Sequence, residues 1–393
     1  MVLFTIALVV MMSFAALASD IGLMWRVKLQ MQGAADAAAV AGADALLAGG
    51  SGAPSTAAQA LSSTNGFTDG SPTSWSSHNV SVTVNNPPAS GAFTGNSSAV
   101  EVIISQLQPS FFAGTLGFAS MTVTARSVAL SSSGPNCVYS LDPAVSGALT
   151  MTSGASISSS CGVLVNSSSS SAININSGAS ISAPSIGVVG GVSSGSGAST
   201  TPAPVTGVAG FPDPLSNVPA PSVGTCTSKT VPLGSSSLSS GYYCGLNVNS
   251  GASLTLNSGS YSFNGNFNVT SGASVTGTGV TLYFKSGTLA ETSGATINLS
   301  APTSGSYSGI LVFEDRSNST QMNVNSGASL TLTGALYLPD ANLTITSGAT
   351  INNVYSILVA DSITVTSGAS ISLNANYSGL SNGSPIRTAV LAE

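Results

Sequence analysis

Four acidic residues in the last third of the chain are spaced so that their carboxylates could meet. Glu314 and Asp315 are followed by Asp340 and then by Asp361, at two steps of similar length. Stacked coils of that length would align them on one face beside Arg316. Such a groove could act on a polyuronide, or the carboxylates alone could bind Ca²⁺. The competing interpretation is isolated turn charges, with Arg316 paired to Glu314 or Asp315. We favour it because aromatic residues that could stack on sugars do not cluster nearby in the sequence.

Other catalytic chemistry finds little support in the sequence. His78 is the only histidine, and a Ser-His-Asp triad would have to use it without a G-x-S-x-G elbow. We expect it to be an exposed loop residue. The sequence contains no cluster of His and Cys for a transition metal, and no phosphate-binding glycine loop stands out. It therefore predicts no cofactor, no catalytic residue and, apart from the weak acidic candidates, no metal site.

The four cysteines are spaced for disulfides rather than for metal binding. Cys137 and Cys161 are too far apart in sequence for a C-x-x-C motif, and so are Cys226 and Cys244. Each separation is close to one repeat length, which would place the pair on neighbouring coils, where a disulfide could join them. Free buried thiols are the alternative. Four cysteines allow three pairings, and sequence alone does not choose among them.

These residues must be positioned by a repeat. The tripeptide Ser-Gly-Ala recurs with glycines at 154, 178, 251, 272, 294, 327, 348 and 368, and the close ones follow one another at nearly even steps. The decamer NVNSGASLTL occurs twice, at 247–256 and 323–332. A fixed period of about 20 residues indicates one structural unit stacked on copies of itself.

Alternation within the repeats indicates strands. Leu246, Val248, Ser250, Ala252 and Leu254 share one parity, so an extended chain would turn all of them to one side. Glycine between two small residues suits a narrow bend. We predict a mainly β protein whose C-terminal part is a right-handed parallel β-helix of on the order of 11 coils. A β-sandwich is the less favoured alternative.

The N-terminal segment, 1–48, predicts one long helix. Residues 1–18 carry no charge, which is enough apolar chain for a membrane span, and 30–47 are rich in alanine. Trp25 would lie at the interface. A retained anchor and a secretory signal cleaved after Ala16-Leu17-Ala18 both fit. Glycines and alanines along the helix could let partner helices pack closely: Gly22, Gly33, Ala34, Ala37, Ala38, Ala41 and Gly42.

The string 20–43 resembles the N-terminal domain of TadG-like proteins, which are bacterial Tad (Flp) pilus-assembly proteins. The shared pattern is an apolar span, D-x-G, a basic pair, Leu-Gln and A-A-D-A-A-A-x-A-G-A. It is carried by Asp20, Gly22, Gln30, Ala34, Ala35, Asp36, Ala37, Ala38 and Gly42. Segments 137–142 and 309–316 resemble C-terminal regions of such proteins. The resemblance implies a single-pass bacterial inner-membrane protein whose C-terminal domain lies in the periplasm or outside the cell, with pilus-assembly or envelope proteins as partners.

The sequence divides into five parts. We expect a transmembrane and stalk helix over 1–48, a Ser/Gly-rich linker over 49–75 and a small α+β module over 76–130. The β-helix would cover 131–385, with a Pro-rich loop leaving it at 193–225, and a tail would follow at 386–393.

Composition limits the function. Only 5% of the residues are charged and seven are Lys or Arg, which excludes a nucleic-acid partner. The hypothesis is a non-enzymatic, membrane-anchored envelope protein of Tad-type pilus assembly. A surface adhesin or glycan-binding β-helix is the alternative, and a polyuronide-active enzyme is third.

Overall fold

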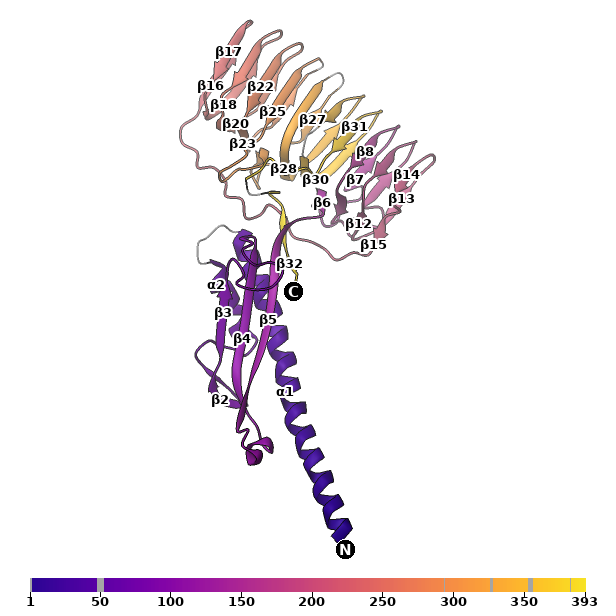
Figure 1. The fold of residues 1–393 in the computed structure, drawn as a ribbon. Helices are drawn as coiled ribbons and strands as arrows, with labels where there is room; N and C mark the ends of the chain where they lie inside the picture. The colour runs from indigo at the N-terminus through magenta and orange to yellow at the C-terminus, as the bar shows by residue number, and fades with distance from the viewer. Residues whose placement is uncertain (1, 48–52, 293, 326–327, 353–355, 382) are drawn as a thin grey trace. The chain divides into compact units, whose positions relative to one another are not determined.

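The chain forms two compact units. The computed structural model describes residues 2–47, 53–292, 294–325, 328–352, 356–381 and 383–393. The first unit contains residues 1–132 and 387–393, and the second contains 133–386. The second unit is therefore an insertion in the chain of the first, between its last two strands (Figure 1).

The predicted long helix is present as α1 (Val2–Leu47), a single element of 46 residues. Its alanine-rich second half has high helix propensity and contains no proline to interrupt it. Over the described part of the chain, no helix combines the length and the apolar character needed to cross a membrane, so the predicted span is not supported. The glycines 49 and 50, which lie in the predicted linker, fall outside the described residues.

The first unit packs α1 against a short helix and an antiparallel sheet. The elements are α2 (Ala53–Thr64), β1 (Pro72–Thr73), β2 (Ser76–Asn79), β3 (Ser81–Asn85), β4 (Ala99–Pro109), the 3₁₀ helix η1 (Ala113–Leu116), β5 (Ser120–Ser133) and β32 (Arg387–Leu391). The main sheet has the order β3-β4-β5-β32. Two expectations are corrected. The predicted linker 49–75 contains α2 and β1, and the predicted tail 386–393 contains β32.

Small residues of α1 serve packing inside this unit. Ala34, Ala35 and Ala38 are buried in its core. A Cβ added to Gly42 would lie 3.2 Å from the Pro54 carbonyl oxygen on α2, so the glycine permits the close approach of the two helices. The expectation that these residues pack against partner helices is therefore wrong for the buried alanines and for Gly42, which pack inside this unit. Gly22 and Gly33 are exposed.

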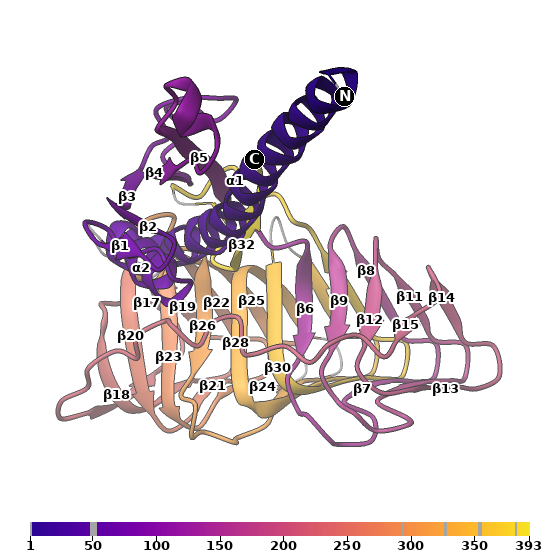
Figure 2. The ribbon, with the colours of Figure 1, turned by 90° about the horizontal axis from the view of Figure 1, so that it is seen from below.

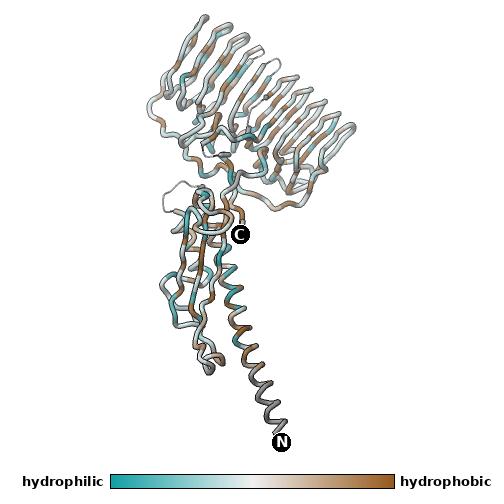
Figure 3. Tube along the Cα trace, in the orientation of Figure 1, coloured by the Kyte–Doolittle hydropathy of each residue, from teal (hydrophilic) through white to brown (hydrophobic). Residues whose placement is uncertain are grey.

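The second unit is the predicted parallel β-helix. One ladder of parallel strands runs β17-β19-β22-β25-β28-β29-β31-β8-β11-β14, one strand from each of about ten coils. Inward Leu, Ile, Val and Phe side chains form one continuous core along it. Hydropathy accordingly alternates along each coil (Figure 3).

The Ser-Gly-Ala tripeptides form the bends of the coils. The alanine N–H donates to the carbonyl oxygen three residues earlier, as from Ala252 to Asn249 at 2.9 Å. Gly251 has φ +72°, a conformation that glycine adopts without a Cβ penalty. The alanine points inward, as predicted. The prediction for Ser250 is wrong, because this residue occupies the outer corner of the turn and is exposed. Ser326 and Gly327 lie outside the described residues.

The coils do not stack in sequence order. The coil containing β30 pairs with β6 and the following β31 pairs with β8, so the last coil adjoins the first (Figure 2). Residues 136–206 form coils on one side of this junction, and 227–373 form those on the other. The connecting residues, 207–226, which we call the strap, run back along the solenoid.

Part of the predicted loop 193–225 is a coil. Strands β13, β14 and β15 pair with β10, β11 and β12, so the ladder continues to Thr206. The overlooked signal is Ser196-Gly197-Ala198, with Gly197 at φ +72° like the other repeat glycines. The prolines at 202 and 204 lie in or next to strands at the edge of the ladder, where a missing donor is tolerated.

The strands of the solenoid have the following bounds: β6 (Asn136–Ser140), β7 (Leu149–Met151), β8 (Ser156–Ser159), β9 (Gly162–Val165), β10 (Ile173–Ile175), β11 (Ser180–Ser182), β12 (Ile186–Val188), β13 (Val192–Ser194), β14 (Ser199–Thr201), β15 (Val205–Thr206), β16 (Thr227–Val231), β17 (Ser235–Leu238), β18 (Gly241–Val248), β19 (Ser253–Leu256), β20 (Gly259–Asn264), β21 (Phe267–Val269), β22 (Ser274–Thr278), β23 (Val280–Ser286), β24 (Leu289–Glu291), β25 (Thr296–Ser300), β26 (Ile310–Glu314), β27 (Met322–Val324), β28 (Ser329–Ile345), β29 (Thr350–Asn352), β30 (Ser356–Val365) and β31 (Ser370–Leu373).

Candidate functional site

Glu314 points into the core of the solenoid rather than into a groove. It follows Ile310 and Val312 in strand parity, and its neighbour in register on the preceding coil is Phe284. The side chain is fully buried, and Thr288 donates its hydroxyl to Oε1 at 2.6 Å. Burial raises the pKa of Glu314 to about 8 against the opposing effect of that hydrogen bond. The residue is therefore a neutral acid at pH 7.

The other predicted carboxylates lie outside the core but do not form a metal site. Asp315 accepts hydrogen bonds from Ser317 and Tyr283 and pairs with Lys285 at 3.1 Å. Asp340 is exposed, and Asp361 is half-buried. Burial, and then the nearby charges of Asp142 and Asp340, raise the pKa of Asp361. In the described part of the chain, no three His, Cys, Asp or Glu side chains gather closely enough to hold a metal ion.

Arg316 fastens the strap to the solenoid instead of serving the carboxylates. Its guanidinium donates to the carbonyl oxygens of Leu215 and Val218, each at 2.9 Å, and to the Tyr337 hydroxyl at 2.9 Å. Tyr337 in turn donates to Asp213 of the strap. The predicted pairing of Arg316 with Glu314 or Asp315 is thus replaced by contacts that hold the crossing segment.

The strap covers an outward row of aromatic rings. Tyr283, Phe313 and Tyr337 follow one another on adjacent coils, with ring centroids 5.2 and 5.0 Å apart. Leu215 of the strap is buried in the core cluster that includes these rings. These three rings are therefore buried and are not available to stack on a sugar.

Both predicted disulfides are present. Cys137 pairs with Cys161, with Cα atoms 5.6 Å apart, and Cys226 pairs with Cys244 at 5.0 Å. The first joins neighbouring coils next to the junction of the two coil sets. The second fixes the end of the strap to β18, so it ties the crossing segment to the coil that the strap reaches.

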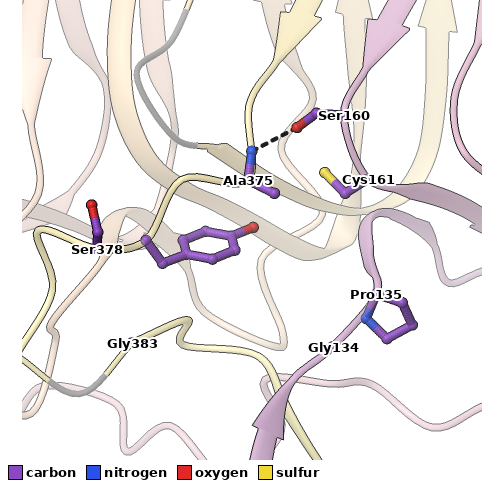
Figure 4. Close-up of a pocket in the computed structure, with 8 residues that line it drawn as sticks. Gly134, Pro135, Ser160, Cys161, Ala375, Ser378 and Gly383 are labelled. Atoms are coloured by element: carbon purple, nitrogen blue, oxygen red, sulfur yellow. Dashed lines mark hydrogen bonds between the residues drawn. The ribbon is translucent and has the colours of Figure 1, made fainter.

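A shallow pocket lies beside the first disulfide, with a volume of about 450 Å³ (Figure 4). Its wall includes Pro135, Ser160, Ala375 and Ser378, and Ser160 accepts a hydrogen bond from the Ala375 N–H at 2.9 Å. Cys161 also lines it but is bonded to Cys137. The pocket thus offers hydroxyls and no reactive thiol.

The family-pattern residue Asp20 has a defined structural role. It is buried on α1, and its carboxylate accepts hydrogen bonds from the backbone N–H groups of Phe111, Phe112 and Ala113 at 2.7–2.9 Å. These three N–H groups lead into η1, at the end of the β4–β5 hairpin. Asp20 therefore clamps the hairpin end to α1.

Other residues of the pattern lie along the same helix. Asp36 accepts a hydrogen bond from Gln32, which also donates to the Arg126 carbonyl oxygen at 2.9 Å. Gln30 is exposed. Asp36 and Ala37 line a pocket of about 650 Å³ together with Leu61 of α2 and residues 387–389 of β32. The pattern thus supplies both core contacts and one wall of a surface pocket.

An ion-pair network that the sequence did not reveal closes the first unit. The Arg126 guanidinium contacts Glu101 and the side chain of Glu393, each at 2.6 Å. Burial acts against ionisation of Glu101, but hydrogen bonds from Asn85, the Ala89 N–H, Arg126 and Ser90 lower its pKa to about 2. No local pattern joins Arg126 to a residue at the far end of the chain, so only the fold could show this contact.

Comparison with known proteins assigns the first unit. Residues 1–45 match the family model described as Flp pilus-assembly TadE/G-like, and 32–129 match one described as Tad-like Flp pilus-assembly. No curated protein and no solved structure matches the chain. The two family matches overlap along α1 and together cover the first unit up to β5. Residues 1–129 are therefore similar to the TadE/G-like and Tad-like families of Flp pilus-assembly proteins.

Proposed function

We propose that this protein acts in Flp pilus assembly at the cell envelope as a non-enzymatic structural component. The observation that carries the proposal is the coincidence of the family match, residues 1–129, with one folded unit closed by the C-terminal strand β32. Partners would be other pilus or envelope proteins. The pocket lined by Asp36, Leu61 and Arg387 is a candidate contact for them.

The N-terminal end of α1 would attach the protein to the inner membrane. Supporting this, residues 1–19 contain no charged side chain, and the described apolar side chains Met11, Phe14 and Leu17 are exposed. The solenoid would then lie in the periplasm or outside the cell, where its two disulfides are stable.

The proposal is tested by deleting the gene and counting Flp pili by electron microscopy. We expect the deletion to remove the pili and the full chain, supplied in trans, to restore them. An unchanged pilus count in the deletion would refute the proposal. Washing membranes with carbonate separately tests attachment through α1, because an attached chain stays with the membranes and a peripheral one is released.

Weak binding of a polysaccharide by the solenoid is a second candidate. The outer faces carry polar ladders, as where Asn268 donates to Asn247 at 2.6 Å and Ser274 donates to Ser253 at 3.1 Å. Purified solenoid, residues 133–386, would be titrated with acidic and neutral glycans. Binding that survives loss of Ca²⁺ would favour this candidate over an acidic Ca²⁺-dependent site.

A further inference from the structure

The end of the β4–β5 hairpin exposes large apolar side chains. In the segment 110–121, which we call the hairpin tip, Phe111 is 70% exposed, Phe118 is 64% exposed and Met121 is 51% exposed. Single exposed apolar residues are ordinary, but a group on one loop marks an interaction surface. The tip lies beside α1, which continues past it toward the N-terminus (Figure 1).

A second exposed apolar surface runs along α1 next to the tip. Met11, Phe14, Leu17, Ile21 and Trp25, which we call the α1 stripe, follow one another at three- or four-residue steps and are 50–68% exposed. This spacing places them on one side of the helix. Asp20, which clamps the tip to α1, lies between Leu17 and Ile21 of the α1 stripe. The tip and the stripe therefore occupy the same position along the axis of α1.

Six backbone N–H groups of the tip are paired within the protein. Asp20 accepts the N–H groups of Phe111, Phe112 and Ala113. The N–H groups of Ser110, Gly117 and Phe118 donate to carbonyl oxygens within the tip at 3.0–3.2 Å. A loop in water has no need of this, whereas a loop that enters lipid must pair its backbone internally.

Charges around the tip fit an anionic membrane surface. Between residues 1 and 35 the charged side chains are Asp20, Arg26 and Lys28, and none occurs between 102 and 125. Asp20 is engaged by the clamp. Arg26 and Lys28 lie about two helical turns beyond it, on the side toward the body of the unit, where headgroup phosphates would be. Arg26 is exposed, and Lys28 donates to the Thr124 carbonyl oxygen. Trp25 adjoins them, as aromatic residues do at a membrane interface.

The position of the tip along α1 agrees with this placement. From Val2 to Ser19 the helix continues beyond the clamp for about 27 Å, at ~1.5 Å of rise for each residue. The hydrocarbon layer of a bilayer is roughly 30 Å thick. If this part of α1 occupies the layer, the tip stands at its surface.

We propose that the hairpin tip inserts its apolar side chains into the interface of an anionic lipid bilayer beside α1, making a second membrane contact that orients the first unit. The inference rests on the proposed membrane attachment of α1. It assigns a role to Asp20: the clamp fixes the height of the tip relative to the helix and removes the backbone donors that lipid would not satisfy.

Labelling tests the proposal on the full chain. The four native cysteines are paired, so a fluorophore sensitive to polarity can be attached at one introduced cysteine. The positions are Phe118→Cys in the tip, Leu17→Cys on the stripe and, as control, Thr94→Cys in the loop at the opposite end of β4. The probe membrane is a vesicle of phosphatidylethanolamine and phosphatidylglycerol containing lipids with a nitroxide near the headgroup.

We expect the label at 118 to shift to shorter wavelength and to be quenched by the nitroxide, while the label at 94 does neither. Adding Phe111→Ser and Met121→Ser should return the 118 signal toward that of the control, in protein whose thermal unfolding is unchanged. Replacing phosphatidylglycerol by phosphatidylcholine should weaken the quenching.

The outcomes separate the two proposals. Quenching at 17 but not at 118 would overturn the tip contact and leave attachment through α1 intact. No quenching at either position would remove both. A shift at 118 that develops without lipid as protein concentration rises would instead assign the tip to a second copy of the chain and overturn the inference.

Discussion

The first unit and the solenoid each bury a glutamate, and they keep it in opposite charge states. Glu101 lies in an antiparallel sheet with Arg126 against it and donors around it, so its pKa is lowered to about 2. Glu314 stands in register with Phe284 and receives one hydrogen bond, from the Thr288 hydroxyl, and burial raises its pKa to about 8. The same side chain is charged in one environment and neutral in the other.

The difference follows from how the two units are built. The first unit joins distant segments, so Arg126 of β5 pairs with both Glu101 of β4 and Glu393, which follows β32. Each coil of the solenoid contacts mainly its two neighbours, so an inward residue meets whatever stands at its register position above and below. Burial there raises the pKa of a glutamate, as at Glu314 and Glu291.

The largest effect should come from removing the partner of the charged glutamate. Arg126→Met leaves Glu101 buried without its cation and should destabilise the first unit by about 3–5 kcal/mol. The matched control is Lys285→Met in the solenoid, whose pair with Asp315 is solvent-exposed and should contribute less than about 1 kcal/mol. Hydrogen exchange in β4 and β26 during urea titration reports each unit separately. Equal losses in the two variants would contradict the comparison.

Through these two glutamates, lowering the pH should destabilise the first unit and stabilise the solenoid. Glu101 has a lowered pKa, so its contribution is present above pH 4.5 and is lost as pH falls toward about 2. Glu314 has a raised pKa, so its contribution is complete below pH 4.5 and is lost as pH rises toward about 8. The change should amount to about 3 kcal/mol for Glu101 and about 5 kcal/mol for Glu314.

Glu314→Gln checks the second half of that prediction. The amide cannot ionise, so the fall in the midpoint of solenoid unfolding between pH 5 and 8 should become clearly smaller. A residual slope is expected from Glu291 and Asp361, whose pKa values burial also raises. Glu101→Gln should leave the solenoid slope unchanged. If the wild-type solenoid shows no slope in this window, Glu314 is not held neutral.

Reduction should weaken the solenoid alone. All four cysteines belong to it, and closing loops of 24 and 18 residues stabilises a folded chain by about 2–4 kcal/mol per bond. We expect dithiothreitol to lower the urea midpoint of the solenoid strands and to leave that of β4 unchanged. The double change Cys226→Ser/Cys244→Ser should lower protection first in β16 and β17, the end coil. Loss of protection in β4 on reduction would run against this expectation.

Release of the strap should have a smaller effect. Arg316→Met removes three hydrogen bonds, two of them to strap carbonyls, for an expected cost of about 1–3 kcal/mol. Limited proteolysis should then cut near Asp213 and Leu215 at lower protease concentration. Lys285→Met serves again as control, because it lies on the solenoid without touching the strap. Unchanged cleavage in Arg316→Met would argue that the strap is held by other contacts.

The smallest effects on stability are expected from two glycine-to-alanine substitutions, and they should have opposite signs in the two units. Gly368 has φ +72° and open space around a Cβ, so Gly368→Ala should cost the solenoid about 1 kcal/mol through backbone strain alone. Gly33 is an exposed helical glycine with equal space, and Gly33→Ala should stabilise the first unit by up to about 1 kcal/mol. Thermal unfolding of the two variants measures both, and shifts of the same sign would contradict the argument.

The local pattern predicted much of the solenoid. Ser-Gly-Ala located the bends because its glycine needs positive φ. The separation of Cys137 and Cys161, close to one repeat, indicated neighbouring coils but did not choose among the three possible pairings. The order of the coils could not be predicted, since every coil presents a similar edge and the pairing of β31 with β8 joins residues far apart in the chain. The coil at Ser196-Gly197-Ala198 was missed because nearby prolines suggested a loop.

The candidate site was harder to predict than the fold. Similar spacing of Glu314, Asp340 and Asp361 indicates similar coils but does not state whether each residue points inward or outward. Parity with Ile310 and Val312 was a usable signal that Glu314 faces the core. Asp20 was identified by its family pattern, but its clamp on the hairpin tip depends on tertiary packing that no local pattern encodes.

The central claim is that pilus assembly resides in the first unit and that the solenoid is an insertion into it. Val128 and Glu393 exchange backbone hydrogen bonds of 2.7 and 3.0 Å, so β5 can be joined to β32 by a short turn. The most direct measurement is the count of Flp pili on cells whose chain has residues 133–386 replaced by such a turn. The account predicts pili in numbers near those of the wild type. Their absence, with the shortened protein folded and present at normal levels, would contradict it.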